Sequence, residues 1–132
     1  MKVFVVLAFW ILSLNATAQK AFEFEYYYGK THHFEIKLSL ANGYILASEI
    51  LETNLATRKK TKYIPTGSSG KTLNLVFLPD TTAASIKRRK RNKIILYNLK
   101  EDYESLPAKI KGSYGIDLKT FSFKLYKQKA IH

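Results

Sequence analysis

The most concentrated chemistry in this sequence is a run of basic residues. Six of the seven residues from Lys87 to Lys93 are lysine or arginine. The planar guanidinium group of arginine binds phosphate or sulfate through two parallel hydrogen bonds, whereas the lysine amine acts as a point charge. This composition predicts an anion-binding site. Its predicted main contacts are Arg88, Arg89, Lys90 and Arg91.

A second basic cluster, RKKTK at 58–62, precedes a candidate strand. If the fold brings both clusters to one end of a sheet, they form a single basic rim. The alternative is a solvated charged surface, because net charge by itself supports solubility without specificity. The predicted supporting contacts are Arg58, Lys59 and Lys60.

Two further patterns suggest chemistry but are incomplete. PTGSSGKT at 65–72 has Pro65 where a phosphate-binding loop requires glycine, so it is interpreted as a Gly/Ser hairpin loop and no nucleotide is expected. His33 and Glu35 lie two residues apart on one polar face and could supply metal ligands or a base with its orienting carboxylate. No third ligand is evident, so neither a metal nor another cofactor is expected.

The sequence carries no positive signal for an enzyme. It has no GxSxG motif and no cysteine, and its acidic residues are scattered. We therefore expect a non-enzymatic protein without catalytic residues. A hydrolase with two spatially paired carboxylates is the third-ranked alternative, because such pairing is invisible in a sequence.

Aromatic residues at 25–30, EYYYGK, offer a different kind of contact. In a strand, Tyr27 faces away from Tyr26 and Tyr28, so at least one ring is expected to meet solvent. We predict Tyr27 as an aromatic contact for a sugar, a base or a protein partner. The alternative is ordinary cross-strand aromatic pairing that stabilises a sheet.

The first 18 residues have the pattern of a secretory signal peptide. Lys2 precedes an apolar run from Val3 to Leu14, and ATA at 16–18 offers small residues for cleavage. The run is shorter than the roughly 20 residues that a membrane-spanning helix needs. The A-x-A site followed by Gln19 resembles those of exported proteins of Gram-negative bacteria. We expect export to the periplasm or the cell exterior, leaving one β-rich domain at 19–132.

The charge of that domain limits its partners. Residues 1–18 contain one lysine and no acid, so their removal leaves 21 basic and 10 acidic residues, a net charge of +11. Such an excess attracts acidic polysaccharide, lipopolysaccharide, anionic lipid or nucleic acid. Because the chain has no cysteine, its stability must come from packing and hydrogen bonds rather than from disulfides.

Alternation with a period of two predicts β-strands after residue 18. The clearest runs are FEFEYYY at 22–28, HHFEIKLSL at 32–40 and YILASEIL at 44–51. Two-residue turns are expected at Gly29-Lys30 and Asn42-Gly43. Further strands are expected at 60–65, 72–78, 92–99 and 115–127, the last with a bulge near 119–120. A short helix capped by Asp80 or Thr81 is expected before the basic run, with a polar hairpin arm as the alternative, and a helical turn is expected at 100–107.

This pattern predicts a mainly β fold. We expect a small antiparallel up-and-down barrel or sandwich of about seven or eight strands, with at most one or two short helical segments. The leading functional hypothesis is an exported binding protein that contacts an anionic polysaccharide or a membrane surface; nucleic acid is the less favoured partner. The alternative is a lipocalin-like carrier of a small apolar ligand. Its cavity would be lined by Phe34, Ile36, Leu75, Phe77, Phe121 and Phe123.

Overall fold

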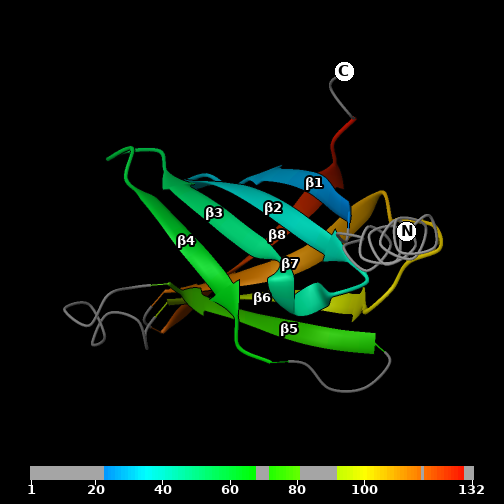
Figure 1. The fold of residues 1–132 in the computed structure, drawn as a ribbon. Helices are drawn as coiled ribbons and strands as arrows, with labels where there is room; N and C mark the ends of the chain where they lie inside the picture. Colours follow the sequence, from blue (N-terminus) through cyan, green and yellow to red (C-terminus); the bar gives the residue numbers. More distant parts are fainter. Residues whose placement is uncertain (1–22, 68–71, 81–91, 117, 130–132) are drawn as a thin grey trace, which may run out of the picture.

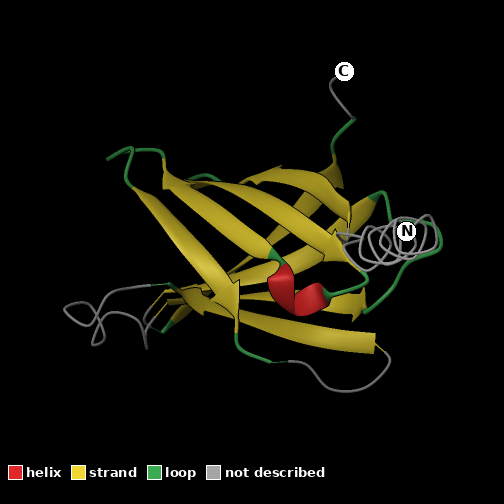
Figure 2. Ribbon diagram, viewed as in Figure 1, coloured by secondary structure: helices red, strands yellow, loops and turns green. Residues whose placement is uncertain are grey.

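Eight antiparallel strands, each paired with the next in sequence, close into a barrel when β8 pairs with β1 (Figure 1). The structure is a computed structural model that describes residues 23–67, 72–80, 92–116 and 118–129. Its elements are β1 (Glu23–Lys30), β2 (Phe34–Asn42), the 3₁₀ turn η1 (Ile45–Ala47), β3 (Glu49–Asn54), β4 (Lys60–Pro65), β5 (Thr72–Pro79), β6 (Asn92–Lys100), β7 (Lys109–Ile116) and β8 (Lys119–Lys127). Figure 2 shows how completely strands dominate the described chain. The predicted mainly β fold is confirmed, and closure decides between barrel and sandwich.

Alternating side chains build the core in the way that the sequence predicts for β2. Phe34, Ile36, Leu38 and Leu40 are buried, while Lys37 between them is exposed. Each of the remaining strands also contributes buried side chains to one apolar cluster inside the barrel. Closure also removes the free sheet edges that an open sheet would expose. The segment at 60–65, expected as a strand, therefore pairs on both sides as β4.

The end of the chain differs from the prediction. Residues 115–127 were expected to form one bent strand, but two strands, β7 and β8, pair as a hairpin whose turn follows Ile116. The change of parity near Lys119 is thus a chain reversal and not a bulge. The predicted helical turn at 100–107 is also wrong, since Lys100 ends β6 and residues 101–107 have no regular secondary structure.

The predicted two-residue turn at Asn42-Gly43 is wrong for a long-range reason. Asn42 is the last residue of β2. Its side-chain amide donates a hydrogen bond to the carbonyl of Tyr103 (3.1 Å) and accepts one from the backbone N–H of Tyr103 (2.8 Å). Gly43 has a φ of 91°, and its N–H donates to the carbonyl of Glu101. The chain then forms η1, so β3 begins at Glu49 and not at Tyr44. A contact with the β6–β7 loop has replaced the local hairpin.

Glycine at position 29 permits the barrel to close. The predicted turn at Gly29-Lys30 is wrong, because both residues belong to β1 and the reversal occurs at 31–33. A Cβ atom on Gly29 would lie 2.5 Å from the carbonyl oxygen of Lys124 and 2.7 Å from a methyl group of Leu125. Only a residue without a side chain fits at this seam between β1 and β8.

Two predicted segments lie outside the described residues. They are the signal peptide at 1–18 and the short helix after Asp80. Within the ranges that the structure covers, no helix combines the length and apolarity needed to cross a bilayer.

Candidate functional site

Of the two predicted basic clusters, the structure describes the second, at 58–62. Arg88, Arg89, Lys90 and Arg91 lie outside the described residues, but β5 runs toward the barrel end from which β6 starts. The β3–β4 turn, with exposed Arg58, Lys59 and Lys60, lies at the same end. We call it the β3–β4 end. Pro79 at the end of β5 and Asn92 at the start of β6 thus lie at the end that carries the second cluster.

The β3–β4 turn holds its cations in a defined backbone. The side-chain oxygen of Asn54 accepts hydrogen bonds from the N–H groups of Ala56 (2.9 Å) and Thr57 (3.1 Å). Arg58 follows with a φ of 62° and donates its N–H to the carbonyl of Asn54 (2.8 Å). Asparagine commonly organises turns in this way. The side chains of Arg58 and Lys59, and that of Lys60 at the start of β4, consequently project from a short turn that backbone and side-chain hydrogen bonds hold in place.

The prediction that Tyr27 contacts an external ligand through an exposed ring is wrong. Tyr27 is 1% exposed, whereas Tyr26 is 58% exposed. The hydroxyl of Tyr27 donates to the carbonyl of Pro107 at 2.7 Å, and burial raises its pKa to about 12. The aromatic face of β1 that faces outward is thus the one carrying Tyr26 and Tyr28. Because both faces of FEFEYYY are aromatic near its end, alternation alone assigned the wrong face.

Close packing of the barrel interior weighs against the carrier alternative. Ile36, Leu75 and Phe77 have no surface accessible to a water-sized sphere, so they border neither solvent nor an internal cavity. Phe34 and Phe123 are also buried, whereas Phe121 is 38% exposed. Eight-stranded barrels are either filled by side chains or hold one small ligand, so the burial of these residues and not the strand number is the relevant observation. Of the six residues predicted to line a cavity, five are therefore part of the buried core, and Phe121 lies at the surface.

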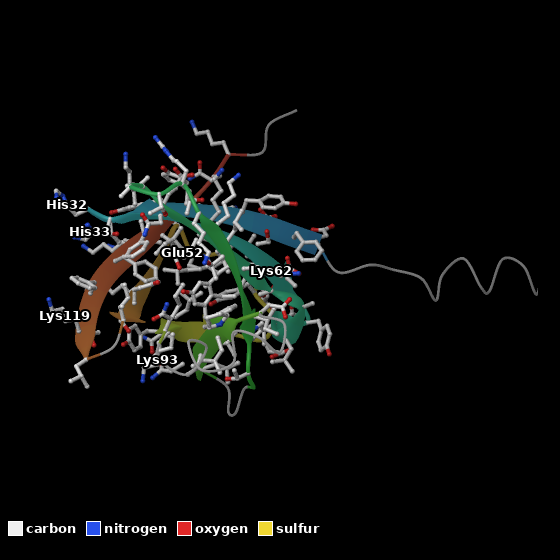
Figure 3. All side chains as sticks on the ribbon, turned by 90° about the vertical axis from the view of Figure 1, so that its left-hand side faces the viewer. His32, His33, Glu52, Lys62, Lys93 and Lys119 are labelled. Carbon is white, nitrogen blue, oxygen red and sulfur yellow. The ribbon has the colours of Figure 1, made fainter. Side chains whose placement is uncertain are left out.

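A buried carboxylate that the sequence analysis missed lies toward the β3–β4 end. One carboxylate oxygen of Glu52 accepts hydrogen bonds from the hydroxyls of Tyr63 (2.7 Å) and Tyr114 (3.0 Å), which lie 3.1 Å apart. Phe34 stacks on Tyr114 with ring centroids 4.7 Å apart. Figure 3, which faces this end, places Glu52 inside the ring of strands and His32 toward its edge. The glutamate is 4% exposed.

The surroundings of Glu52 favour its protonated form. Burial raises the pKa of the carboxyl group, while the two tyrosine hydrogen bonds and the charge of Lys59 oppose this shift. Burial likewise raises the pKa values of Tyr63 and Tyr114. The sequence contained a signal for this cluster, because Glu52 shares the strand parity of buried Ile50. The cluster of Glu52, Tyr63 and Tyr114 joins β3, β4 and β7. Its packing and hydrogen bonds explain its presence as part of the structural core.

Among the described residues, three lysines that form no salt bridge lie together on the outer face of β7, β8 and β1. Lys111 and Lys124 are directly opposite each other on β7 and β8. Tyr28 is opposite Tyr126, and continuing this register by two residues brings Lys30 beside Lys124. We call Lys30, Lys124 and Lys111 the lysine row.

The lysine row lines a pocket of about 510 Å³. Exposed Tyr97 and Tyr126 border the pocket together with Ser122, and its described lining contains no acidic residue. In the described part of the chain, none of the three lysines forms a salt bridge. The carboxylate of Glu35, which lies across from Lys30 on β2, is 3.5 Å from the amine of Lys37 instead.

Like charges directly opposite each other destabilise a sheet. The lysine row therefore costs folding free energy in the free protein, and an anion in the pocket would offset that cost. The sequence contained two signals for the lysine row, KIK at 109–111 and KLY at 124–126. In each, a buried apolar residue separates two residues that face outward. These signals were missed because the row exists only in the register of three strands.

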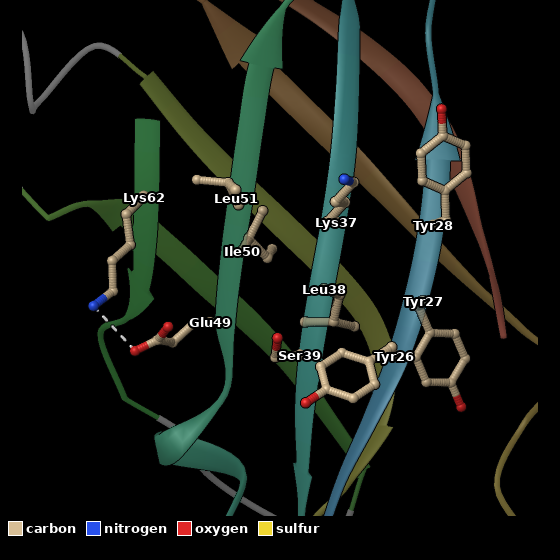
Figure 4. A pocket seen from close by; sticks show the side chains of 10 residues that line it. All are labelled: Tyr26, Tyr27, Tyr28, Lys37, Leu38, Ser39, Glu49, Ile50, Leu51 and Lys62. Carbon is tan, nitrogen blue, oxygen red and sulfur yellow. Dashed lines mark ion pairs between the residues drawn. The ribbon is translucent and has the colours of Figure 1, made fainter. Parts of the chain in front are cut away.

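A second pocket, of about 370 Å³, lies on the outer face of β1 to β4 (Figure 4). Tyr26 and Tyr28 border one side of it. On the other side, the amine of Lys62 is 3.1 Å from the carboxylate of Glu49, which raises the pKa of this lysine. Lys37 lies between these sides and is 62% exposed. This pocket combines aromatic faces with hydrogen-bonding groups of both charges.

No group of three or more His, Cys, Asp or Glu side chains that could hold a metal ion occurs among the described residues. The ring of His33 instead lies edge-on to Phe34 and to Phe121.

Comparison with known proteins found no matching family model, no similar curated protein and no similar solved structure. The functional argument therefore depends on the geometry of this chain.

Proposed function

We propose that this protein is an exported, non-enzymatic binding protein for acidic polysaccharide. The observation that carries the proposal is the lysine row, in which three amines share one pocket without an acidic partner. Lysine amines provide attraction with little directional demand, which suits carboxylate or sulfate groups along a flexible polymer. Binding would release counterions and would therefore weaken steeply as salt increases.

The rest of the pocket favours sugar over other anions. Tyr97 and Tyr126 are 36% and 53% exposed and offer apolar ring faces with a polar hydroxyl at the edge. The hydroxyl of Tyr97 forms a hydrogen bond of 2.8 Å with that of Ser113, which fixes the ring beside Lys111. Rings held in this way suit the flat faces of pyranose sugars. A simple phosphate site would need no such rings.

The basic run and the β3–β4 turn enter the proposal as a second contact region. Their strands open on one end of the barrel, and a long polymer would reach both this end and the lysine row. The predicted contacts remain Arg88, Arg89, Lys90 and Arg91, with Arg58, Lys59 and Lys60 in support. Lipopolysaccharide and anionic lipid present the same charges in the predicted compartment and are outcomes of the test.

Retention on a heparin column in a salt gradient tests the proposal. The double variant Lys111→Gln/Lys124→Gln should elute at clearly lower salt than the wild type. The matched control Lys119→Gln/Lys129→Gln removes the same charge from exposed positions outside the row and should elute close to the wild type. Equal elution of both doubles would mean a diffuse positive surface and would overturn the proposal.

A third variant measures the contribution of the predicted basic run. In it, Arg88, Arg89 and Arg91 are changed to glutamine. Earlier elution of this triple alone would assign binding to the run and reject the lysine row. Earlier elution of both the triple and the row double would support two contact regions.

A further inference from the structure

The two outer pockets meet at the seam where the barrel closes. Tyr126 borders the lysine-row pocket and Tyr28 borders the pocket of Figure 4. These two tyrosines are direct cross-strand partners on β8 and β1. A ligand that leaves one pocket along the barrel surface therefore enters the other without crossing a loop.

Register pairs extend this junction into a row around the barrel. Lys109 pairs with Tyr126, Tyr28 with Lys37, Lys37 with Leu51, and Leu51 with Lys62. None of the six side chains is acidic, and all are exposed or half-buried. We call this row the Tyr28 belt: Lys109, Tyr126, Tyr28, Lys37, Leu51 and Lys62.

The length of the Tyr28 belt limits the kind of ligand. It crosses six strands, so five strand spacings of about 4.8 Å give it a length of roughly 24 Å. A monosaccharide or a single phosphate group would occupy only a small part of it. Lys37 is paired with Glu35, and Lys62 is paired with Glu49 and Asp80, so the unpaired amines beside the belt are those of the lysine row. This arrangement matches a polymer that places acidic groups at the lysine row and sugar rings and hydroxyls along the rest of the belt.

We infer that the Tyr28 belt binds one unbranched segment of an acidic polysaccharide that follows the curve of the barrel surface, with sugar rings against Tyr126 and Tyr28 and acidic groups near the lysine row. This inference rests on the proposed function and adds the geometry of the ligand. The charge pattern argues for a chain of uronic or sulfated sugars. Glu49, beside the far end of the belt, is held by Lys62 and accepts sugar hydroxyls there.

Calorimetric titration with oligogalacturonides of increasing length tests the inference. The affinity of the wild type should rise with length and reach a plateau when one chain fills both pockets. Tyr28→Leu should weaken the plateau affinity by about five- to tenfold, the order expected for one lost stacking contact. The same variant should leave the affinity of the shortest bound oligomer unchanged. Tyr28→Phe retains the ring and should bind like the wild type.

Matched controls separate failure of this inference from failure of the proposed function. Tyr44→Leu removes an exposed tyrosine outside the belt and should not change binding. Linear polyphosphate, which has charge but no sugar ring, should bind Tyr28→Leu and wild type equally. If oligogalacturonides bind without a length plateau, or bind Tyr28→Leu as tightly as wild type, the inference is wrong while the proposed function stands. If neither polymer binds in a salt-dependent manner, both are wrong.

Discussion

Reversing one charge in the lysine row should stabilise the free protein while it weakens polyanion binding. Lys124 lies between Lys111 and Lys30, so Lys124→Glu converts two repulsive neighbours into two attractive ones. A cross-strand charge pair changes stability by about 0.2–1 kcal/mol in either direction. Counting the directly opposed pair with Lys111 alone, the repulsion removed and the attraction gained should together raise the free energy of unfolding by about 0.5–2 kcal/mol.

Urea unfolding at low and high salt measures this gain. With a urea slope of about 2 kcal/mol per molar, the midpoint should rise by roughly 0.3–1 M. The shift should shrink at 1 M salt, because exposed charges are then strongly screened. The matched control is Lys119→Glu, which makes the same charge change on the same strand opposite Ile116. If Lys124→Glu is no more stable than this control at low salt, the repulsion argument is refuted.

Three further predictions concern the barrel itself. Because the folded state raises the pKa of Glu52, it binds this proton more tightly than the unfolded chain does, and the contribution of Glu52 to stability falls as pH rises through the folded pKa. Glu52→Gln should therefore gain stability over wild type as pH rises from acid to neutral in urea titrations; a constant difference would contradict this. Gly29→Ala, whose Cβ would lie 2.5 Å from the carbonyl oxygen of Lys124, should lose about 1–3 kcal/mol in urea unfolding, and an unchanged midpoint would disprove the close approach. Tyr27→Phe deletes the 2.7 Å hydrogen bond to Pro107 and should cost about 0.5–1.5 kcal/mol by the same assay, whereas wild-type stability would show that water replaces it.

Local alternation predicted those parts of the fold that depend on one strand at a time. In β2 the apolar residues from Phe34 to Leu40 face the core as expected, and similar patterns marked β4, β5 and β6. The strand β7 was missed because KIKGSYGI contains two lysines and two glycines, which dilute an apolar pattern. Glycine at 112 fits there because a Cβ would meet the ring of Phe123 at 2.5 Å. Such a packing reason is invisible before the partner strand is known.

Features that depend on contacts between distant segments could not be predicted in this way. Asn42 and Gly43 carry the residue types of a tight turn, but the β6–β7 loop uses their hydrogen-bonding groups. The lysine row likewise unites residues 30, 111 and 124 through barrel closure. The anionic partner expected from the sequence stays a prediction, and its predicted main contacts are in a basic run that lies outside the described residues.

Chemical-shift mapping of the protein by NMR during titration with an oligogalacturonide tests the central claim most directly. The account predicts that the largest changes cluster in the backbone amides of 28–30, 109–112 and 122–127, around the lysine row, and that they reverse on addition of salt. Changes concentrated at 55–60 and 87–93 would instead place the binding site at the β3–β4 end. Changes confined to core residues such as Leu75 and Phe77 would indicate a ligand inside the barrel and would contradict the account.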